Sequence, residues 1–89
     1  MVSKDIIISN RLGLHARAAA QLVRLANKYP CEIHLKNGAQ ISDAKSVMEV
    51  LMLGATEGNS LLVTADGDKE RDALKALEDL FKARFNEIE

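Results

Sequence analysis

The order of apolar and polar residues predicts a strand, a turn and a helix in the first third of the chain. Residues 2–9 include three consecutive isoleucines, whose β-branched side chains favour a pleated strand. Asn10 and Gly13 then interrupt the pattern as turn residues do. Residues 16–27 carry apolar side chains at helical spacing, namely Ala19, Leu22, Val23 and Ala26. This helix should end before Pro30, because proline disfavours helical geometry in the residue that precedes it.

The pattern then changes to the period of a strand. Residues 31–36 alternate strictly between apolar and polar side chains, which predicts a strand with one face on a core and the other in water. Asn37-Gly38 is typical of a tight hairpin turn and should lead into a short third strand over residues 39–42. Residues 60–65 predict a fourth strand.

The last predicted element is a helix that begins after Asp66-Gly67. Asp68 is positioned to cap it. Acidic residues near its start and basic residues near its end match the helix dipole. The stripe expected to face inward consists of Ala73, Leu77, Leu80, Phe81 and Arg84 or Phe85.

These elements follow one another in the order βαββαβα, and half-buried strands need helices on only one face. We therefore expect an α+β fold of the open-faced β-sandwich type. A chain of 89 residues with 47% hydrophobic side chains suffices for one domain, residues 1–89.

Composition narrows the classes of function. The formal net charge of -1 gives no general attraction to nucleic acid or to an anionic membrane, and no apolar run approaches the length of a membrane span. A single cysteine cannot form an intramolecular disulfide, which fits a reducing cytosol. We expect a cytoplasmic monomer without membrane insertion.

The candidate chemistry lies where the first predicted helix begins. His15 falls at that boundary, where the first backbone N–H groups lack intrahelical partners and the helix dipole favours negative charge. Such a place suits a phosphate. Arg17 adds a positive charge and a planar fork of donors, and Arg11, Arg24 and Lys28 could extend the basic patch.

A neutral imidazole in this position can attack phosphorus and carry the phosphoryl group on a ring nitrogen. The helix start should help to keep the ring neutral, and Arg17 could offset charge on the phosphoryl oxygens. Which ring nitrogen reacts is left open by the sequence. The alternative is that His15 is only a tolerated cap and Arg17 a solvated side chain.

The segment Gly13-Leu14-His15-Ala16-Arg17, together with Lys45-Ser46-Val47-Met48, resembles the HPr family, the histidine-containing phosphocarriers of the bacterial phosphotransferase system. The resemblance spans essentially the whole chain. It implies an antiparallel sheet of strand order 1-4-2-3 with three helices on one side, phosphorylation of His15 with Arg17 as its partner, and regulatory phosphorylation at Ser46. One departure is Ala18, where the family usually has proline, which would pre-set φ in the first helical turn.

Residues 47–54 predict a short helix that is apolar around nearly its whole circumference. Only one stripe can be buried in a domain with one layer of helices, and Met-rich patches often bind partners. A helix buried wholly in the core would show the same pattern. By resemblance to HPr, the surface that contacts donor and acceptor proteins would comprise Val47, Met48, Leu51, Leu14, Ala20 and Arg24.

Ser46 has two interpretations. Ser46-Val47-Met48-Glu49 matches a capping box, in which the serine oxygen accepts from the N–H of Glu49 and the glutamate reaches back to the serine N–H. The resemblance instead implies phosphorylation by an HPr kinase/phosphorylase. A phosphate would place negative charge in the middle of the docking surface, which could block partners without remodelling the fold.

The chain lacks residues that several other functions would require. The chain has no Gly-rich phosphate-binding loop for ATP, so it must receive phosphate from another protein. Cys31 and His34 lie on opposite faces of a strand and cannot share a metal ion, so we expect no metal and no cofactor. An RNA platform needs aromatic residues on a sheet, whereas Tyr29, Phe81 and Phe85 fall outside the predicted strands.

We therefore predict a phosphocarrier rather than an enzyme. Enzyme I of the phosphotransferase system would phosphorylate His15, and IIA proteins would accept the group. The alternative is a regulatory binding module that acts through Ser46 and the helix of residues 47–54, including a role like that of the nitrogen-related paralogue. The sequence leaves open whether the carrier serves sugar transport, carbon catabolite regulation or a nitrogen-related branch.

Overall fold

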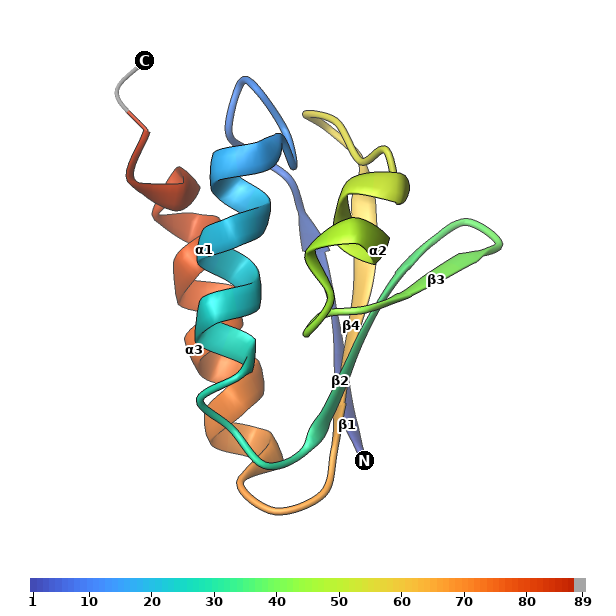
Figure 1. The fold of residues 1–89 in the computed structure, drawn as a ribbon, viewed down its shortest axis with the longest axis vertical. Coiled ribbons are helices and arrows are strands. Elements are labelled where there is room, and N and C mark those ends of the chain that lie inside the picture. The colour runs from blue at the N-terminus through green and yellow to red at the C-terminus, as the bar shows by residue number, and fades with distance from the viewer. Residues whose placement is uncertain (88–89) are drawn as a thin grey trace.

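The computed structural model describes residues 1–87 and confirms the predicted βαββαβα order (Figure 1). It adds a short 3₁₀ helix after the last α-helix. The elements are β1 (Val2–Ile7), α1 (Ala16–Ala26), β2 (Glu32–Asn37), β3 (Gln40–Asp43), α2 (Val47–Met52), β4 (Ser60–Asp66), α3 (Glu70–Lys82) and η1 (Arg84–Asn86). The expected single domain, residues 1–89, includes residues 88–89, which lie outside the described residues.

The four strands form one antiparallel sheet of order β1-β4-β2-β3, as the resemblance implied. The strand β4 is central, since Leu61 pairs with Ile6 of β1 and Val63 pairs with Leu35 of β2. Figure 1 shows α1 and α3 side by side over the sheet. The short helix α2 contacts α1 and β3. This arrangement is the predicted open-faced α+β sandwich.

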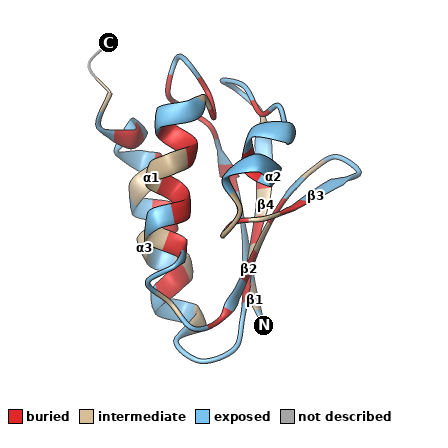
Figure 2. Cartoon of the chain, in the orientation of Figure 1, coloured by how far each residue is buried: buried red, intermediate tan, exposed pale blue. Residues whose placement is uncertain are grey.

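Burial follows the predicted alternation. Ile33 and Leu35 of β2 are fully buried, whereas Glu32 and Lys36 of the same strand are exposed. The buried residues of α1 and α3 lie on the faces turned toward the sheet (Figure 2). On α3 these residues include Ala73, Leu77 and Phe81, as predicted, whereas Leu80 is only partly buried. The core is therefore a single layer between the sheet and its helices.

The start of α3 differs from the prediction. Lys69, with φ 61°, occupies the N-cap position, and no side chain caps the helix there, so the expectation for Asp68 was wrong. Instead, the Glu70 carboxylate accepts a hydrogen bond from the backbone N–H of Gly67 at 3.1 Å. The glutamate in the first turn replaces an aspartate cap because its longer side chain can reach back to the turn.

Candidate functional site

The loop that carries His15 is fixed to the segment before β4. The N–H of Ile8 donates to Asn59 O at 2.9 Å, and the N–H of Leu14 donates to Ala55 O at 3.1 Å. Gly13 has φ +65° and lies so close to this segment that a Cβ atom would be 2.7 Å from Ala55 O. Only glycine satisfies both the left-handed backbone and the close approach. The position of His15 thus depends on a contact between two loops that are distant in sequence.

His15 is the N-cap residue of α1, as predicted, and has extended backbone geometry. Its side chain makes no capping hydrogen bond, while its carbonyl accepts the first helical bond from Ala19 at 2.8 Å. The first turn of α1 contains no acidic residue and does contain Arg17, which is exposed. A cation at this end of a helix opposes the dipole, so the arrangement favours a bound anion rather than helix stability.

The His15 side chain contacts a residue that the sequence analysis did not identify, Glu87. The Glu87 carboxylate lies 2.5 Å from His15 Nε2, and the same oxygen, Oε2, accepts a hydrogen bond from Asn10 Nδ2 at 3.1 Å. The His15 side chain is 27% exposed, whereas that of Glu87 is only 4% exposed. These two residues are separated by 72 positions, so no local pattern could have revealed the pair.

The hydrogen bond from His15 lowers the pKa of Glu87 below its ordinary value of 4.5, against the opposing effect of desolvation. Asn10 and the charge of Arg17 contribute in the same direction as His15. Glu87 is therefore ionised at neutral pH. The sequence reasoning considered only the helix start beside the ring and did not include this carboxylate. Asn10 is itself fully buried and also donates to Gly13 O at 2.8 Å, which ties the loop and the carboxylate together.

The helix α2 has one buried and one exposed face. Val50 and Leu53 are buried, which leaves four exposed apolar side chains, Val47, Met48, Leu51 and Met52. The alternative of a helix wholly within the core is therefore wrong. Of the other residues expected at the docking surface, Arg24 is exposed and Ala20 is partly buried, but Leu14 is only 6% exposed and belongs to the core.

Half of the predicted capping box is present at Ser46. Its Oγ accepts from the N–H of Glu49 at 3.3 Å. The Glu49 carboxylate does not return to the serine but accepts from the N–H of Asp43 at 3.0 Å, while the N–H of Ser46 donates to Asp43 O. The prediction of the reciprocal half was therefore wrong. The backbone N–H of Asp43 binds the Glu49 carboxylate, and the backbone carbonyl of Asp43 accepts from the N–H of Ser46. Ser46 is partly buried at the edge of the exposed apolar face.

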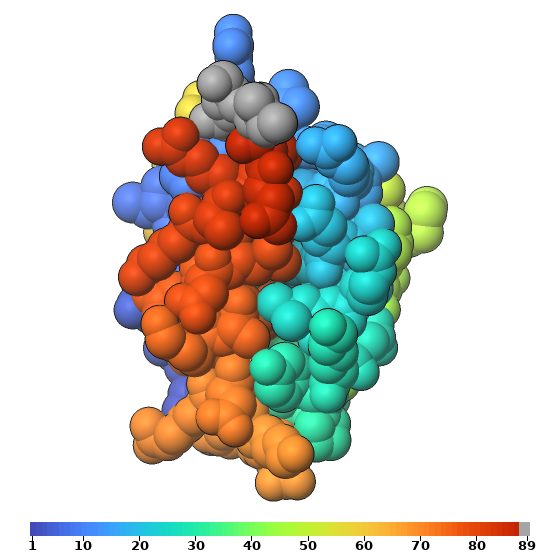
Figure 3. All heavy atoms as spheres, turned by 90° about the vertical axis from the view of Figure 1, so that its left-hand side faces the viewer, coloured from blue at the N-terminus to red at the C-terminus, as the bar shows by residue number. Residues whose placement is uncertain are grey.

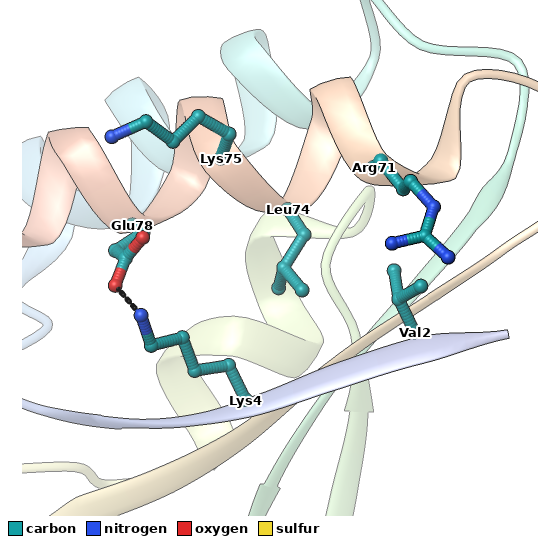
Figure 4. A pocket seen from close by; sticks show the side chains of 6 residues that line it. All are labelled: Val2, Lys4, Arg71, Leu74, Lys75 and Glu78. Carbon is teal, nitrogen blue, oxygen red and sulfur yellow. Dashed lines mark ion pairs between the residues drawn. The ribbon is translucent and has the colours of Figure 1, made fainter.

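Other parts of the molecule are weaker candidates for a functional site than the region around His15. Cys31 is 1% exposed and has a free thiol. Within residues 1–87, no group of three His, Cys, Asp or Glu side chains could hold a metal ion, and no helix has the length and apolarity needed to cross a membrane. A shallow cleft between β1 and α3 is crossed by the ion pair of Lys4 and Glu78, and its lining includes neither His15 nor Glu87 (Figure 4).

The His15 site therefore combines a partly exposed imidazole, a helix start and an arginine, and the helix that His15 caps contacts α2, which has an exposed apolar face. Residues 2–83 match the family model described as the PTS HPr component phosphorylation site. The chain belongs to the HPr family. Members of this family are phosphocarriers of the phosphotransferase system, and this chain is a phosphocarrier of that kind.

Individual relatives agree with this assignment. The chain is 44% identical to phosphocarrier protein HPr of Pseudomonas aeruginosa, with 100% of both chains covered. It is 39% identical to phosphocarrier protein NPr of Klebsiella oxytoca, with 97% of each covered. A crystal structure of HPr from Thermoanaerobacter tengcongensis superposes with a TM-score of 0.96 and 39% identity over 100% of both chains.

Proposed function

We propose that His15 accepts a phosphoryl group on Nδ1 and passes it on, so that the chain acts as a carrier and not as an enzyme. The observation that carries this proposal is the contact of Glu87 with Nε2, which leaves Nδ1 as the ring nitrogen available for attack. Arg17 is placed in the first turn of the helix that His15 caps, where its guanidinium can offset charge on the phosphoryl oxygens.

The donor is enzyme I and the acceptors are IIA proteins. Both must approach the same histidine in turn, so a single adaptable surface beside it suits the function. The exposed side chains Val47, Met48 and Leu51 of α2 provide such a surface, and Ala20 and Arg24 extend it along α1, which contacts α2. We place the exchange in the cytoplasm, with residues 1–89 acting as one domain and as a monomer.

The test is transfer of labelled phosphate from phosphoenolpyruvate through purified enzyme I. The parent should acquire acid-labile label, and the His15→Ala variant should acquire none. His34→Ala is the matched control, because His34 is the second of the two histidines and lies on β2. Its label should equal that of the parent. Absence of label on the parent would instead favour the regulatory binding module.

Phosphorylation of Ser46 would regulate this carrier. Ser46 borders the exposed apolar face of α2, where a phosphate would add nearly two negative charges to the docking surface. Glu49, whose N–H binds Ser46 Oγ, adds a further negative charge to this region. We expect Ser46→Asp to keep its fold but to receive phosphoryl groups on His15 more slowly than the parent, with Ser46→Ala as the uncharged control. An unchanged rate for Ser46→Asp would refute electrostatic blocking.

A further inference from the structure

The chain makes an unusual turn after α3. Arg84, Phe85 and Asn86 have φ values of 54°, 54° and 59°, which residues other than glycine rarely adopt. Phe85 is fully buried and its ring meets that of Phe81 edge to face, with centroids 5.1 Å apart. Gln21 Nε2 of α1 donates to Phe85 O at 3.1 Å. Burial and this hydrogen bond hold a turn that its own backbone disfavours.

This turn places Glu87 in contact with His15. In the view of Figure 3 the C-terminal turn lies against the first turns of α1. The Glu87 carboxylate contacts His15 Nε2 and Asn10 Nδ2 through one oxygen, and the other oxygen, Oε1, is buried without a hydrogen bond from residues 1–87. The negative charge is therefore shared with one neutral amide and the imidazole ring.

We propose that Glu87 is a positioning residue for phosphoryl transfer, which holds His15 through Nε2–H and stabilises the positive charge that the ring acquires when Nδ1 bonds to phosphorus. This inference rests on the proposed function of His15. The family model ends at residue 83, so it includes neither the turn nor Glu87.

The transfer step balances without any further reactant. The lone pair of Nδ1 forms the N–P bond while the bond between phosphorus and the donor breaks, and the donor keeps that electron pair. The His15 ring then carries the phosphoryl group on Nδ1, a proton on Nε2 and one positive charge. The adjacent carboxylate lowers the free energy of this state more than that of the neutral ring, as the aspartate does for the imidazolium of a catalytic triad.

Three arginines lie on the segments that carry the pair or adjoin it. Arg17 of α1 acts on the Glu87 carboxylate, and Arg11 of the preceding loop and Arg84 of the turn are exposed side chains on the neighbouring segments. All three are cations that remain charged at any working pH. A pH profile of the transfer rate can therefore report on the Glu87 carboxylate without interference from these arginines.

The test compares Glu87→Gln with Glu32→Gln. Both variants remove one carboxylate, but Glu32 is an exposed residue of β2 that pairs with Asp66 at the far end of the sheet. Glutamine keeps the size of the side chain and an acceptor for Nε2–H, so the fold should be retained, and a thermal melt checks this. The rate of phosphoryl transfer from phosphorylated enzyme I is measured by rapid quenching.

We expect Glu87→Gln to slow transfer by on the order of tenfold, the lower end of the loss seen when the carboxylate behind a metal-bound histidine is removed. A second measurement needs no partner protein. Hydrolysis of the isolated phosphohistidine is followed against pH, and its acid-accelerated limb should move to lower pH in Glu87→Gln because the ring is harder to protonate. Glu32→Gln should match the parent in both measurements, and Glu87→Asp should recover part of the transfer rate.

The outcomes separate this inference from the carrier function. If the parent itself takes no label, the carrier function fails. If the parent is labelled on His15 while Glu87→Gln transfers at the parent rate with the parent's hydrolysis profile, only the role of Glu87 is overturned. A faster rate in Glu87→Gln would also overturn it and would make the carboxylate an obstacle to the incoming phosphoryl group.

Discussion

Replacing Gly13 by alanine should weaken the fold and the site together. Gly13 combines φ +65° with a position where a new Cβ would lie 2.7 Å from Ala55 O and 2.9 Å from Thr56 Cα. The left-handed backbone alone costs an alanine about 1 kcal/mol. Relief of the clash must separate the two loops, which weakens the hydrogen bond from Leu14 N to Ala55 O and costs about 1 kcal/mol more.

With some loss of packing, the free energy of unfolding should fall by about 3 kcal/mol. A urea titration followed by circular dichroism measures this change. For a domain of this size the midpoint should fall by about 2 M at an unchanged slope. The labelled-phosphate assay, corrected for the folded fraction, should also show slower transfer, because the same loop positions His15.

Gly54 supplies the control. It has φ +62°, but a Cβ atom added there would meet no other atom within 4 Å, so Gly54→Ala incurs the backbone cost of about 1 kcal/mol without the clash. The difference between the two variants measures the contact between the loops. Equal losses of stability in Gly13→Ala and Gly54→Ala would refute the role of the close approach.

Three further outcomes follow from the contacts. The pKa of Glu87 is lowered in the folded state, so the ionised carboxylate stabilises the fold at pH values above the ordinary pKa of 4.5. This contribution is lost as the pH falls through the folded pKa. Urea titrations of the parent and of Glu87→Gln should therefore differ more at pH 7 than at pH 3. Ser46→Ala should lose about 1 kcal/mol with its N-cap hydrogen bond, whereas Ser46→Asp, which keeps an acceptor, should melt near the parent temperature. Phe85→Ala should lose about 3–5 kcal/mol in the same titration and should also release Glu87, so that transfer slows as in Glu87→Gln; transfer at the parent rate would separate the turn from the site.

The sequence by itself determined the order of the helices and strands and the position of His15 at a helix start. Strict alternation in residues 31–36 and helical spacing in residues 16–27 are local patterns, and each reflects one face buried and one face in water. His15 could be placed at a helix start because the signals for that boundary lie within a few residues of it. The same reasoning predicted that α2 could bury only one stripe.

The tertiary structure decided which groups meet. Asp68 and the return half of the capping box at Ser46 were wrong because several nearby donors and acceptors compete, and local spacing does not rank them. Leu14 was expected at the docking surface but is buried, because its loop folds inward against Ala55. Glu87 was missed altogether, since its contact with His15 depends on a left-handed turn held by the burial of Phe85. The sequence thus placed His15 at a helix start, whereas the packing of residues 84–87 decided that the Glu87 carboxylate contacts its Nε2 atom.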